Sequence, residues 1–210
     1  VAAINGLNAD VIALSEIEDT FAVTGDIERR DEALATMVDA LNAEGGNWKY
    51  VESPEKVPAS PDVIRVAFIY NPDRVEPVGE SRIFEDDRFT GTAREPLAQE
   101  FKPVAEDVTE SFVAVANHFK SKGSIAGDDA DQGDGQGNNA NLRVEQAQAV
   151  RDHLAAQPDW DDKATFVMGD LNSYTREHAI DVFRDGGYSV PQEDYDASTS
   201  YQFDGLLGSL

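Results

Sequence analysis

The sequence predicts an α/β layered domain, and two observations lead to this expectation. Short runs of apolar, β-branched residues alternate with longer segments whose apolar residues recur at helical spacing. Each apolar run is bounded by Pro, Gly or Asp, which are residues that end strands and begin turns. Strands interleaved with helices build sheets that helices cover. The chain has no internal repeat, and its 210 residues suit a single domain.

Six strands and three helices are expected from this pattern. The strands span residues 11–17, 48–52, 64–70, 97–101, 112–118 and 164–168. The helices span residues 27–42, 141–156 and 176–185, and the first and last stop at a pair of glycines. Residues 52–62 and 121–140 are expected to be loops, the second a flexible acidic loop beside an active site.

Acidic residues are in large excess. The chain has 41 Asp and Glu against 17 Lys and Arg, which gives a formal net charge of −24 at pH 7. A surface with this charge repels polyanions at long range, so a nucleic acid would have to be met by local cations or a bound metal. The alternative is that the charge serves solubility, including in a salty habitat where screening is strong.

The composition also excludes several classes of protein. Because the chain has no cysteine, disulfides, thiol catalysis and thiolate metal sites are ruled out. No apolar run approaches the roughly 20 residues that a membrane-spanning helix needs, so the chain is expected to be soluble, without a membrane partner. It begins at Val1 with no signal peptide ahead of the first apolar run, so both ends are expected to be cropped from a longer protein.

Glu16 is the first candidate for chemistry. It closes the apolar run 11–17 and shares a face of that strand with Ile12 and Leu14. A carboxylate on an apolar face needs a partner, and a hard divalent cation is a natural one. The alternative is an ordinary Glu exposed at a strand edge.

His118 is the second candidate, at the end of the strand 112–118. Lys120 and Lys122 follow it, in a chain with only six lysines. Such a cluster suits a phosphate ester, because ammonium groups hold the anion and an imidazole can donate a hydrogen bond or a proton. The alternative is a structural histidine whose hydrogen bonds are satisfied inside the protein.

Asp170 and Asn172 form the third candidate. They follow the apolar run 164–168 after Gly169 and point the same way, two residues apart. Gly permits a sharp exit from the strand, Asp supplies a base or metal ligand, and Asn offers an amide N–H to a developing oxyanion. The alternative is a Gly-Asp turn capped by an Asn.

A calcium loop in residues 121–140 is excluded, although the segment is rich in Gly and Asp. Counting from Asp129, the fifth position is Gly133 and the twelfth is Ala140, where the calcium-binding loop requires a bidentate Glu.

Taken in this order, the three candidates resemble the endonuclease/exonuclease/phosphatase superfamily, and within it the large secreted bacterial nucleases. The resemblance covers essentially the whole chain, and the stretches that support it are residues 13–19, 64–72, 93–101, 117–124, 131–143, 169–177 and 201–210. The resemblance implies a four-layered α/β sandwich of two mixed β-sheets packed face to face with helices outside, incomplete at both termini. An Asn-bearing strand is expected before Val1, and strands with an Asp and an Asp-His pair after Leu210.

The resemblance also implies roles for individual residues. These are Glu16 as metal ligand, His118, Asp170 and Asn172 as catalytic residues, and Arg94 as a contact to the substrate backbone. Lys120 and Lys122 match a basic stretch of the secreted group, and their contact to phosphate is inferred from their charge. The implied cofactor is Mg²⁺, with Mn²⁺ or Ca²⁺ as alternatives, and the implied reaction is hydrolysis of nucleic acid, DNA first.

Two alternatives remain beside a secreted nuclease. One is a phosphatase or phospholipid phosphodiesterase on the same scaffold, since the fold does not settle the substrate. The other is an acidic secreted module that binds calcium and has lost activity. The fragment itself is expected to be nearly inactive, because groups at the two ends of the family domain are missing from it. The sequence does not address the oligomeric state.

Overall fold

The computed structural model describes residues 1–59, 61–191, 201–203 and 206–208. The chain folds into two compact units. Unit 1 consists of Val1–Glu85, Arg94–Asn117 and Asp159–Gly169, and unit 2 consists of Asp86–Ala93, His118–Pro158 and Asp170–Leu210.

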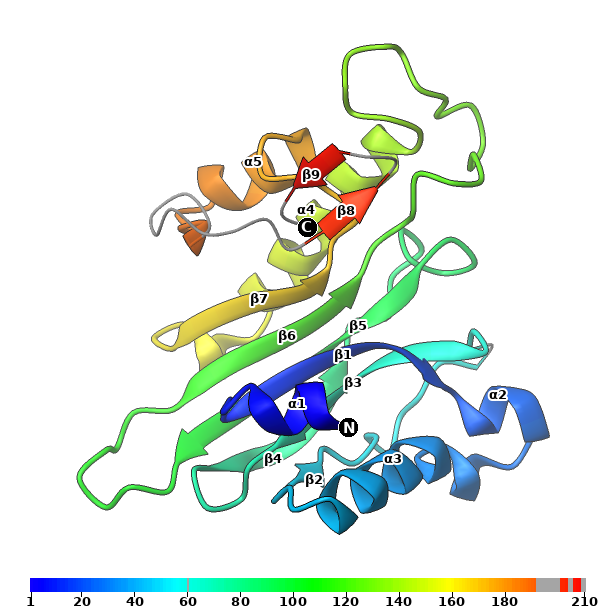
Figure 1. Cartoon of the computed structure of the whole chain (residues 1–210). Coiled ribbons are helices and arrows are strands. Elements are labelled where there is room, and N and C mark those ends of the chain that lie inside the picture. Colours follow the sequence, from blue (N-terminus) through cyan, green and yellow to red (C-terminus); the bar gives the residue numbers. More distant parts are fainter. Residues whose placement is uncertain (60, 192–200, 204–205, 209–210) are drawn as a thin grey trace. The chain divides into compact units, whose positions relative to one another are not determined.

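The secondary structure alternates between strands and helices along the chain (Figure 1). In chain order the elements are α1 (Ala2–Gly6), β1 (Val11–Glu18), α2 (Thr20–Thr24), the 3₁₀ helix η1 (Ile27–Arg29), α3 (Glu32–Ala43), β2 (Lys49–Tyr50), β3 (Ile64–Tyr70), β4 (Val75–Ile83), β5 (Arg94–Pro103), β6 (Phe112–His118), α4 (Ala140–Ala155), the 3₁₀ helix η2 (Pro158–Trp160), β7 (Ala164–Asp170), α5 (His178–Asp185), β8 (Tyr201–Phe203) and β9 (Leu206–Gly208).

Unit 1 is built on two sheets. Strands β1 and β2 both pair antiparallel with β3, in the order β1-β3-β2. Strands β4, β5, β6 and β7 form the second sheet in that order, with β4 and β5 antiparallel. Figure 1 shows β6 and β7 running in the same direction, so this sheet is mixed. The expected α/β architecture of two sheets with helices is confirmed.

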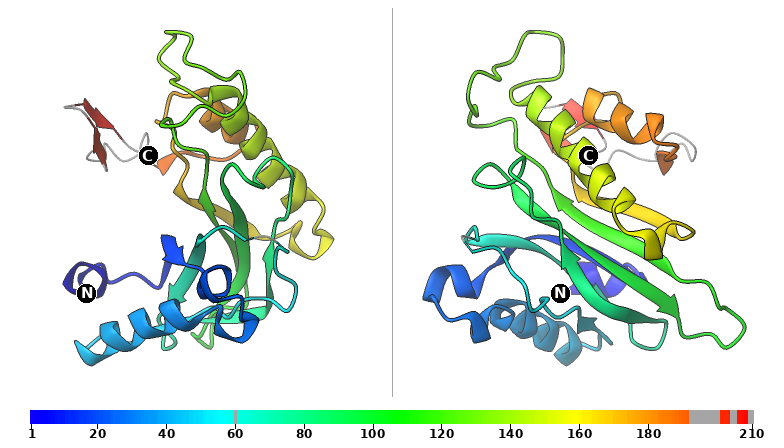
Figure 2. Two further views of the ribbon diagram at one scale, coloured as in Figure 1. Left: turned by 90° about the vertical axis from the view of Figure 1, so that its right-hand side faces the viewer. Right: turned by 180° about the vertical axis from the view of Figure 1, so that it is seen from behind.

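Strand β3 is buried on both of its faces. Phe68 and Tyr70 pack on Phe101 of β5, with ring centroids 5.8 Å and 6.0 Å apart. Ile69 points to the opposite side and packs in a cluster with Leu41 of α3. Figure 2 shows α3, in blue, running along that side of the sheet. Because neighbouring strand residues alternate between faces, burial on both sides explains why β3 is apolar throughout.

The expectation of one helix over residues 27–42 is wrong in its first part. The segment forms the short helix η1, and α3 begins only at Glu32. The carboxylate of Asp31 lies between the two and accepts hydrogen bonds from Ser53 N at 2.9 Å and from Arg65 Nη2 at 2.6 Å. These tertiary contacts fix Asp31 and separate the two helices.

Strand β4 was not predicted, because Pro77 and Gly79 interrupt its sequence. The β4–β5 register shifts between Val78 and Arg82, and Gly79 has a φ of +67° inside this irregularity. Such a bulge accommodates residues that a regular strand excludes. Of the stretch 201–210 named above, residues 204–205 and 209–210 lie outside the described residues, and the backbones of β8 and β9 pair antiparallel.

Unit 2 contains α4 and α5, which pack against each other (Figure 2). Arg151 of α4 donates a hydrogen bond from Nη1 to the carbonyl of Val182 in α5, at 2.9 Å. In the part of the chain that the structure describes, every helix is too short or too polar to cross a bilayer.

A charged network fixes the segment 86–93 to α4. Arg88 donates to both oxygens of Asp86, from Nε at 2.8 Å and from Nη2 at 2.7 Å, and pairs with Asp152 at 3.0 Å. His153 Nε2 lies 3.2 Å from Asp86 Oδ2. The hydrogen bond from the Arg88 side chain is the main reason that the pKa of Asp86 lies well below its ordinary value.

We expect Asp86→Asn to destabilise the protein at pH 7 by about 1.5–3 kcal/mol, the usual contribution of a hydrogen bond to a charged group. A carboxyl whose pKa is lowered in the folded state stabilises the fold above its unfolded pKa of about 3.9, and this stabilisation fades as the pH falls below that value. Urea unfolding of both proteins at pH 7 and pH 3 tests this. An equal difference at both pH values would contradict the assignment.

Candidate active site

His118 and Asp170 lie together in unit 2, at the ends of β6 and β7. His118 Nε2 is 4.0 Å from Asp170 Oδ2. The backbone N–H of Phe119 donates to the Asp170 carbonyl at 2.9 Å, so the strand ends are hydrogen-bonded at the candidate residues. The imidazole side chain is 6% exposed and the carboxylate 38%. A buried imidazole therefore stands beside a carboxylate that solvent can reach.

Asn172 joins this pair through two hydrogen bonds. Its backbone N–H donates to Asp170 Oδ1 at 2.8 Å, and its Nδ2 donates to the Phe119 carbonyl at 3.0 Å. Asn172 has a φ of +48°, a left-handed conformation that Asn tolerates better than most residues. The side chain that accepts at this turn belongs to Asp170, whereas the Asn172 side chain bonds the neighbouring segment at Phe119. An amide nitrogen carries two N–H groups, so Asn172 can keep this contact and still donate to an oxyanion.

Gly169 allows β7 to approach β6 closely. Its φ is +115°, and a Cβ placed there would lie 2.2 Å from the carbonyl oxygen of Asn117. The fully buried Asn117 donates from Nδ2 to the carbonyls of Val115 at 2.8 Å and Met168 at 3.2 Å. The Asn117 side chain therefore links β6 to β7 just before His118 and Asp170, the polar residues that end the two strands.

Gly169→Ala should destabilise the protein by about 3 kcal/mol or more, because backbone atoms of both strands must move to admit the Cβ. Thermal or urea unfolding measures the loss. Gly187→Ala is a suitable comparison, since Gly187 also has a positive φ but open space around it. Equal losses for the two variants would show that close packing at Gly169 is unimportant.

Glu16 lies in unit 1, on an irregular part of β1. Leu14 pairs with Ala67 and Ile17 pairs with Arg65, so two residues of β1 face the single Val66 of β3. Glu16 occupies this bulge with a φ of +60°, and its side chain is exposed. The simple alternation that placed Glu16 with Ile12 and Leu14 therefore fails at the bulge. Bulges often redirect a side chain at a functional site, and a left-handed Glu stores strain.

Glu16→Gly and Glu16→Ala separate the strain from the carboxylate. Both variants lose the charged group, but Gly accepts the left-handed backbone whereas Ala keeps its cost of about 1 kcal/mol. We expect the Gly variant to be the more stable of the two by about that amount in urea unfolding at pH 7. If the Ala variant is equally stable, Glu16 is not strained.

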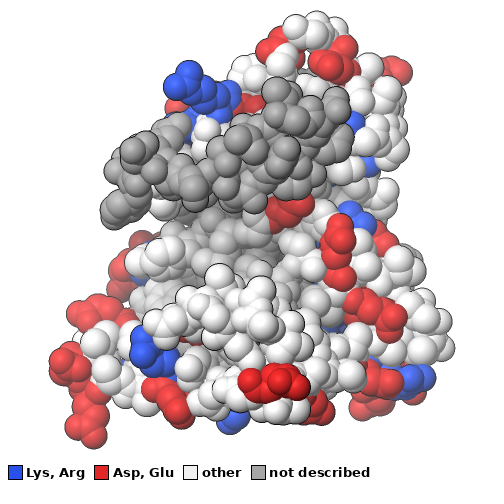
Figure 3. All heavy atoms as spheres, viewed as in Figure 1, with Lys and Arg blue, Asp and Glu red and all other residues white. Residues whose placement is uncertain are grey.

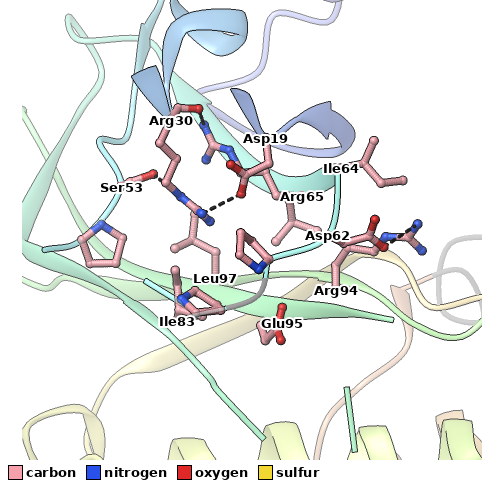
Figure 4. A pocket seen from close by; sticks show the side chains of 14 residues that line it. Asp19, Arg30, Ser53, Asp62, Ile64, Arg65, Ile83, Arg94, Glu95 and Leu97 are labelled. Atoms are coloured by element: carbon pink, nitrogen blue, oxygen red, sulfur yellow. Dashed lines mark hydrogen bonds and ion pairs between the residues drawn. The ribbon is translucent and has the colours of Figure 1, made fainter. Parts of the chain in front are cut away.

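Arg94 lies in a small pocket of unit 1, which Figure 4 shows. Its Nη2 is 3.3 Å from Asp62 Oδ2. Deeper in the pocket, Arg30 pairs with the fully buried Asp19 at 2.6 Å. Burial lowers the pKa of Arg30, and the Asp19 carboxylate opposes this effect. Arg94, which is predicted to contact the substrate, therefore already has a carboxylate partner in Asp62.

The two lysines after His118 have different partners. Lys122 forms an ion pair with Glu177 Oε1, and its ammonium lies 4.6 Å from the centre of the Tyr174 ring. Lys120 donates from Nζ to the hydroxyl of Ser124 at 2.9 Å. Lys122 is therefore neutralised by a carboxylate, whereas Lys120 has a neutral partner.

Residues 121–140 are held by hydrogen bonds, in contrast to the expected flexible loop. Asn139 is fully buried, with a φ of +63°. Its Oδ1 accepts from Ala126 N at 2.8 Å, and its Nδ2 donates to the carbonyls of Ser121 at 2.7 Å and Ser124 at 2.8 Å. Asn139, Arg143 and Glu177 belong to none of the sequence patterns that predict a functional residue. The run of Asn residues before the helix was the available signal for Asn139.

The donors for a metal ion are divided between the units. Within the described residues, no three His, Asp or Glu side chains are close enough to hold a metal ion together. Asp170 lies beside His118 in unit 2, and Glu16 forms no hydrogen bond or ion pair with the residues described. Carboxylate oxygens are the ligands that Mg²⁺ prefers, so the donor chemistry fits this ion.

Comparison with known proteins finds solved structures that share this fold. No protein-family model and no curated protein matches the chain. Among solved structures, the endonuclease/exonuclease/phosphatase from Bacteroides vulgatus is 11% identical with a TM-score of 0.56, over 88% of this chain and 60% of that one. An endonuclease/exonuclease/phosphatase family protein from Bacteroides thetaiotaomicron is 13% identical with a TM-score of 0.52, over 88% and 57%. A mannosyl-6-phosphatase from the same species is 13% identical with a TM-score of 0.53, over 88% and 59%.

The chain therefore spans between 57% and 60% of the length of these proteins. Their low identity means that the similarity concerns the fold and leaves the substrate open. The chain has an α/β sandwich fold that it shares with these endonuclease/exonuclease/phosphatase proteins.

Proposed function

We propose that this chain is the catalytic part of a metal-dependent phosphodiesterase that hydrolyses nucleic acid, with DNA as its substrate. The observation that carries the proposal is the placement of His118, Asp170 and Asn172 at the ends of two neighbouring strands. A base, a buried hydrogen-bond donor and an amide are what hydrolysis of a phosphate ester requires in one place. We also propose that the protein acts outside the cell, as the resemblance to secreted nucleases implies.

Asp170 is the proposed base. Asn172 N–H holds its Oδ1 at 2.8 Å, while the carboxylate as a whole is accessible to solvent. In the proposed step, the oxygen of a water molecule forms a bond to phosphorus, one ester P–O bond breaks, and Asp170 takes a proton from the water. The leaving oxygen departs as a hydroxyl group after it takes a proton from solvent, and the product keeps the phosphate as a monoester. The fixed Oδ1 orients the carboxylate, which lowers the entropic cost of holding the water in line.

His118 and Asn172 are the proposed donors to the non-bridging phosphate oxygens. Hydrogen bonds from a buried imidazole act in a medium of low dielectric constant, where they stabilise developing charge more than in water. Lys120 adds a cation on the segment that follows His118. Arg94 in unit 1 is a further proposed contact to the substrate backbone.

Glu16 is the proposed ligand of Mg²⁺, with Mn²⁺ or Ca²⁺ as substitutes. When bound, such a cation neutralises charge on the phosphate oxygens. The exposed carboxylate of Glu16 has no hydrogen-bond or ion-pair partner among the described residues, and the bulge holds it in a left-handed conformation. Both features support a ligand role.

A phosphatase acting on a small phosphate ester is the second candidate, and charge favours it. The net charge is −24, and acidic side chains are spread over the face shown in Figure 3. Two of the proposed phosphate contacts, Arg94 and Lys122, already pair with Asp62 and Glu177. A long polyanion needs several free cations, whereas a small ester needs few.

We expect Asp170→Asn in the full-length protein to lower turnover of plasmid DNA with Mg²⁺ by about 100-fold or more. Its stability should change by about 1 kcal/mol or less, since the Asn172 N–H keeps an oxygen acceptor. Asp185→Asn is the matched control, because Asp185 is an exposed residue of the same unit. Supercoiled-plasmid nicking and urea unfolding measure the two quantities.

Parallel assays on sphingomyelin, inositol phosphates and sugar phosphates, each with Mg²⁺ or EDTA, separate the candidate substrates. Cleavage of DNA that EDTA and Asp170→Asn both abolish supports a nuclease. Turnover of the small esters alone supports the second candidate. Full turnover of DNA by the Asp170→Asn variant would refute the assigned role of Asp170.

A further inference from the structure

Glu177 is a buried carboxylate that the proposed chemistry does not use. It immediately precedes α5, five positions after Asn172, and its side chain is 6% exposed. Two cations flank it, since Lys122 pairs with Oε1 and Arg143 Nη2 lies 3.6 Å from Oε2. Burying a charge is costly unless it is paired, so this arrangement commits Lys122 and Arg143 to Glu177.

Both cations belong to the segment that follows β6 or to the helix after it. Lys122 lies four positions after His118, and its carbonyl accepts a hydrogen bond from Asn138 Nδ2 at 3.0 Å. Arg143 in α4 is almost completely buried and donates to the carbonyls of Asn138 at 2.6 Å and Gln136 at 2.7 Å. Burial lowers the pKa of Arg143, and the Glu177 carboxylate opposes this effect.

Glu177 therefore connects the segment after β7 with the segment after β6. A second link supports the same connection, because the backbone N–H of His178 donates to Gln136 Oε1 at 2.9 Å. His118 and Lys120 lie on one of these segments, and Asp170 and Asn172 on the other. These contacts lie outside the site, and they add to the hydrogen bonds that join the two segments at Phe119.

We propose that Glu177 and Lys122 are positioning residues that hold the His118 and Asp170 segments in register. On this proposal Lys122 acts through Glu177, in place of the phosphate contact that its charge predicts. Lys120 is the lysine of the pair that contacts phosphate. The kinetic part of this inference rests on the proposed function, whereas its structural part does not. A displacement of about 1 Å in such a site lowers rates by about 100-fold.

The two lysines provide a matched kinetic test. In the full-length protein, Lys122→Met should lower kcat by about 10-fold or more and leave KM within about twofold, because it disturbs geometry. Lys120→Met should raise KM by about fivefold or more with little change in kcat, because it removes a contact to the substrate. Lys122→Arg, which keeps the charge beside Glu177, should restore most of the lost kcat.

Amide hydrogen exchange tests the structural part without any assay of activity. In Lys122→Met and in Glu177→Gln, the amides of Phe119 and Asn172 should exchange about 10-fold faster than the change in global stability explains. Asp86→Asn is the control, because it weakens unit 2 at a network that contains neither lysine. In that variant, both amides should follow global stability alone.

The outcomes distinguish the two proposals. A raised KM with unchanged kcat in Lys122→Met would return Lys122 to the substrate contacts and overturn the inference. Exchange of Phe119 and Asn172 that follows global stability alone in both variants would also overturn it. If the wild-type protein turns over no substrate, the proposed function fails and the exchange experiment alone decides. If Glu177→Gln does not fold, Lys122→Met decides, since its side chain is 30% exposed.

Discussion

The close pairing of β6 with β7 is the constraint on which the candidate site depends. It requires a residue without a Cβ at position 169, because any side chain there would collide with the Asn117 carbonyl. Beyond that point the Phe119 N–H binds the Asp170 carbonyl, and the Asn172 amide binds the Phe119 carbonyl. His118 on one segment and Asp170 and Asn172 on another, distant in sequence, are thereby held close together by strand pairing and by one side-chain amide.

Several cationic side chains of this protein form ion pairs with carboxylates of the same chain. Arg30, Arg94 and Lys122 are each paired with a carboxylate, two of them in largely buried surroundings. Such pairs contribute little net stability, but they exclude arrangements that would leave a charge unpaired. The chain has a net charge of −24, which opposes long-range attraction of an anion. Under the proposed function, the site therefore relies on local donors and a bound cation more than on long-range attraction.

The sequence predicted the parts of the fold that depend on local pattern. Strands β3 and β6 are continuous apolar runs and were predicted with their bounds, and the polar residues at the ends of β6 and β7 were found for the same reason. Strand β4 was missed because Pro77 and Gly79 are tolerated only in an irregular strand. The break before α3 was missed because it depends on contacts of Asp31 with Ser53 and Arg65, which are distant in sequence.

The roles of Glu177 and Asn139 could not be predicted from the sequence pattern, since a buried polar residue is recognisable only by its hydrogen-bond and ion-pair partners. The bulge at Glu16 was missed too, because two residues facing one cannot be read from a single strand.

A crystal structure of the full-length protein with Mg²⁺ and inorganic phosphate tests the central claim most directly. The account predicts phosphate oxygens within hydrogen-bond distance of His118 Nε2 and Asn172 Nδ2, with the Asp170 carboxylate beside them. Phosphate bound elsewhere, with His118 and Asp170 in separate surroundings, would contradict it.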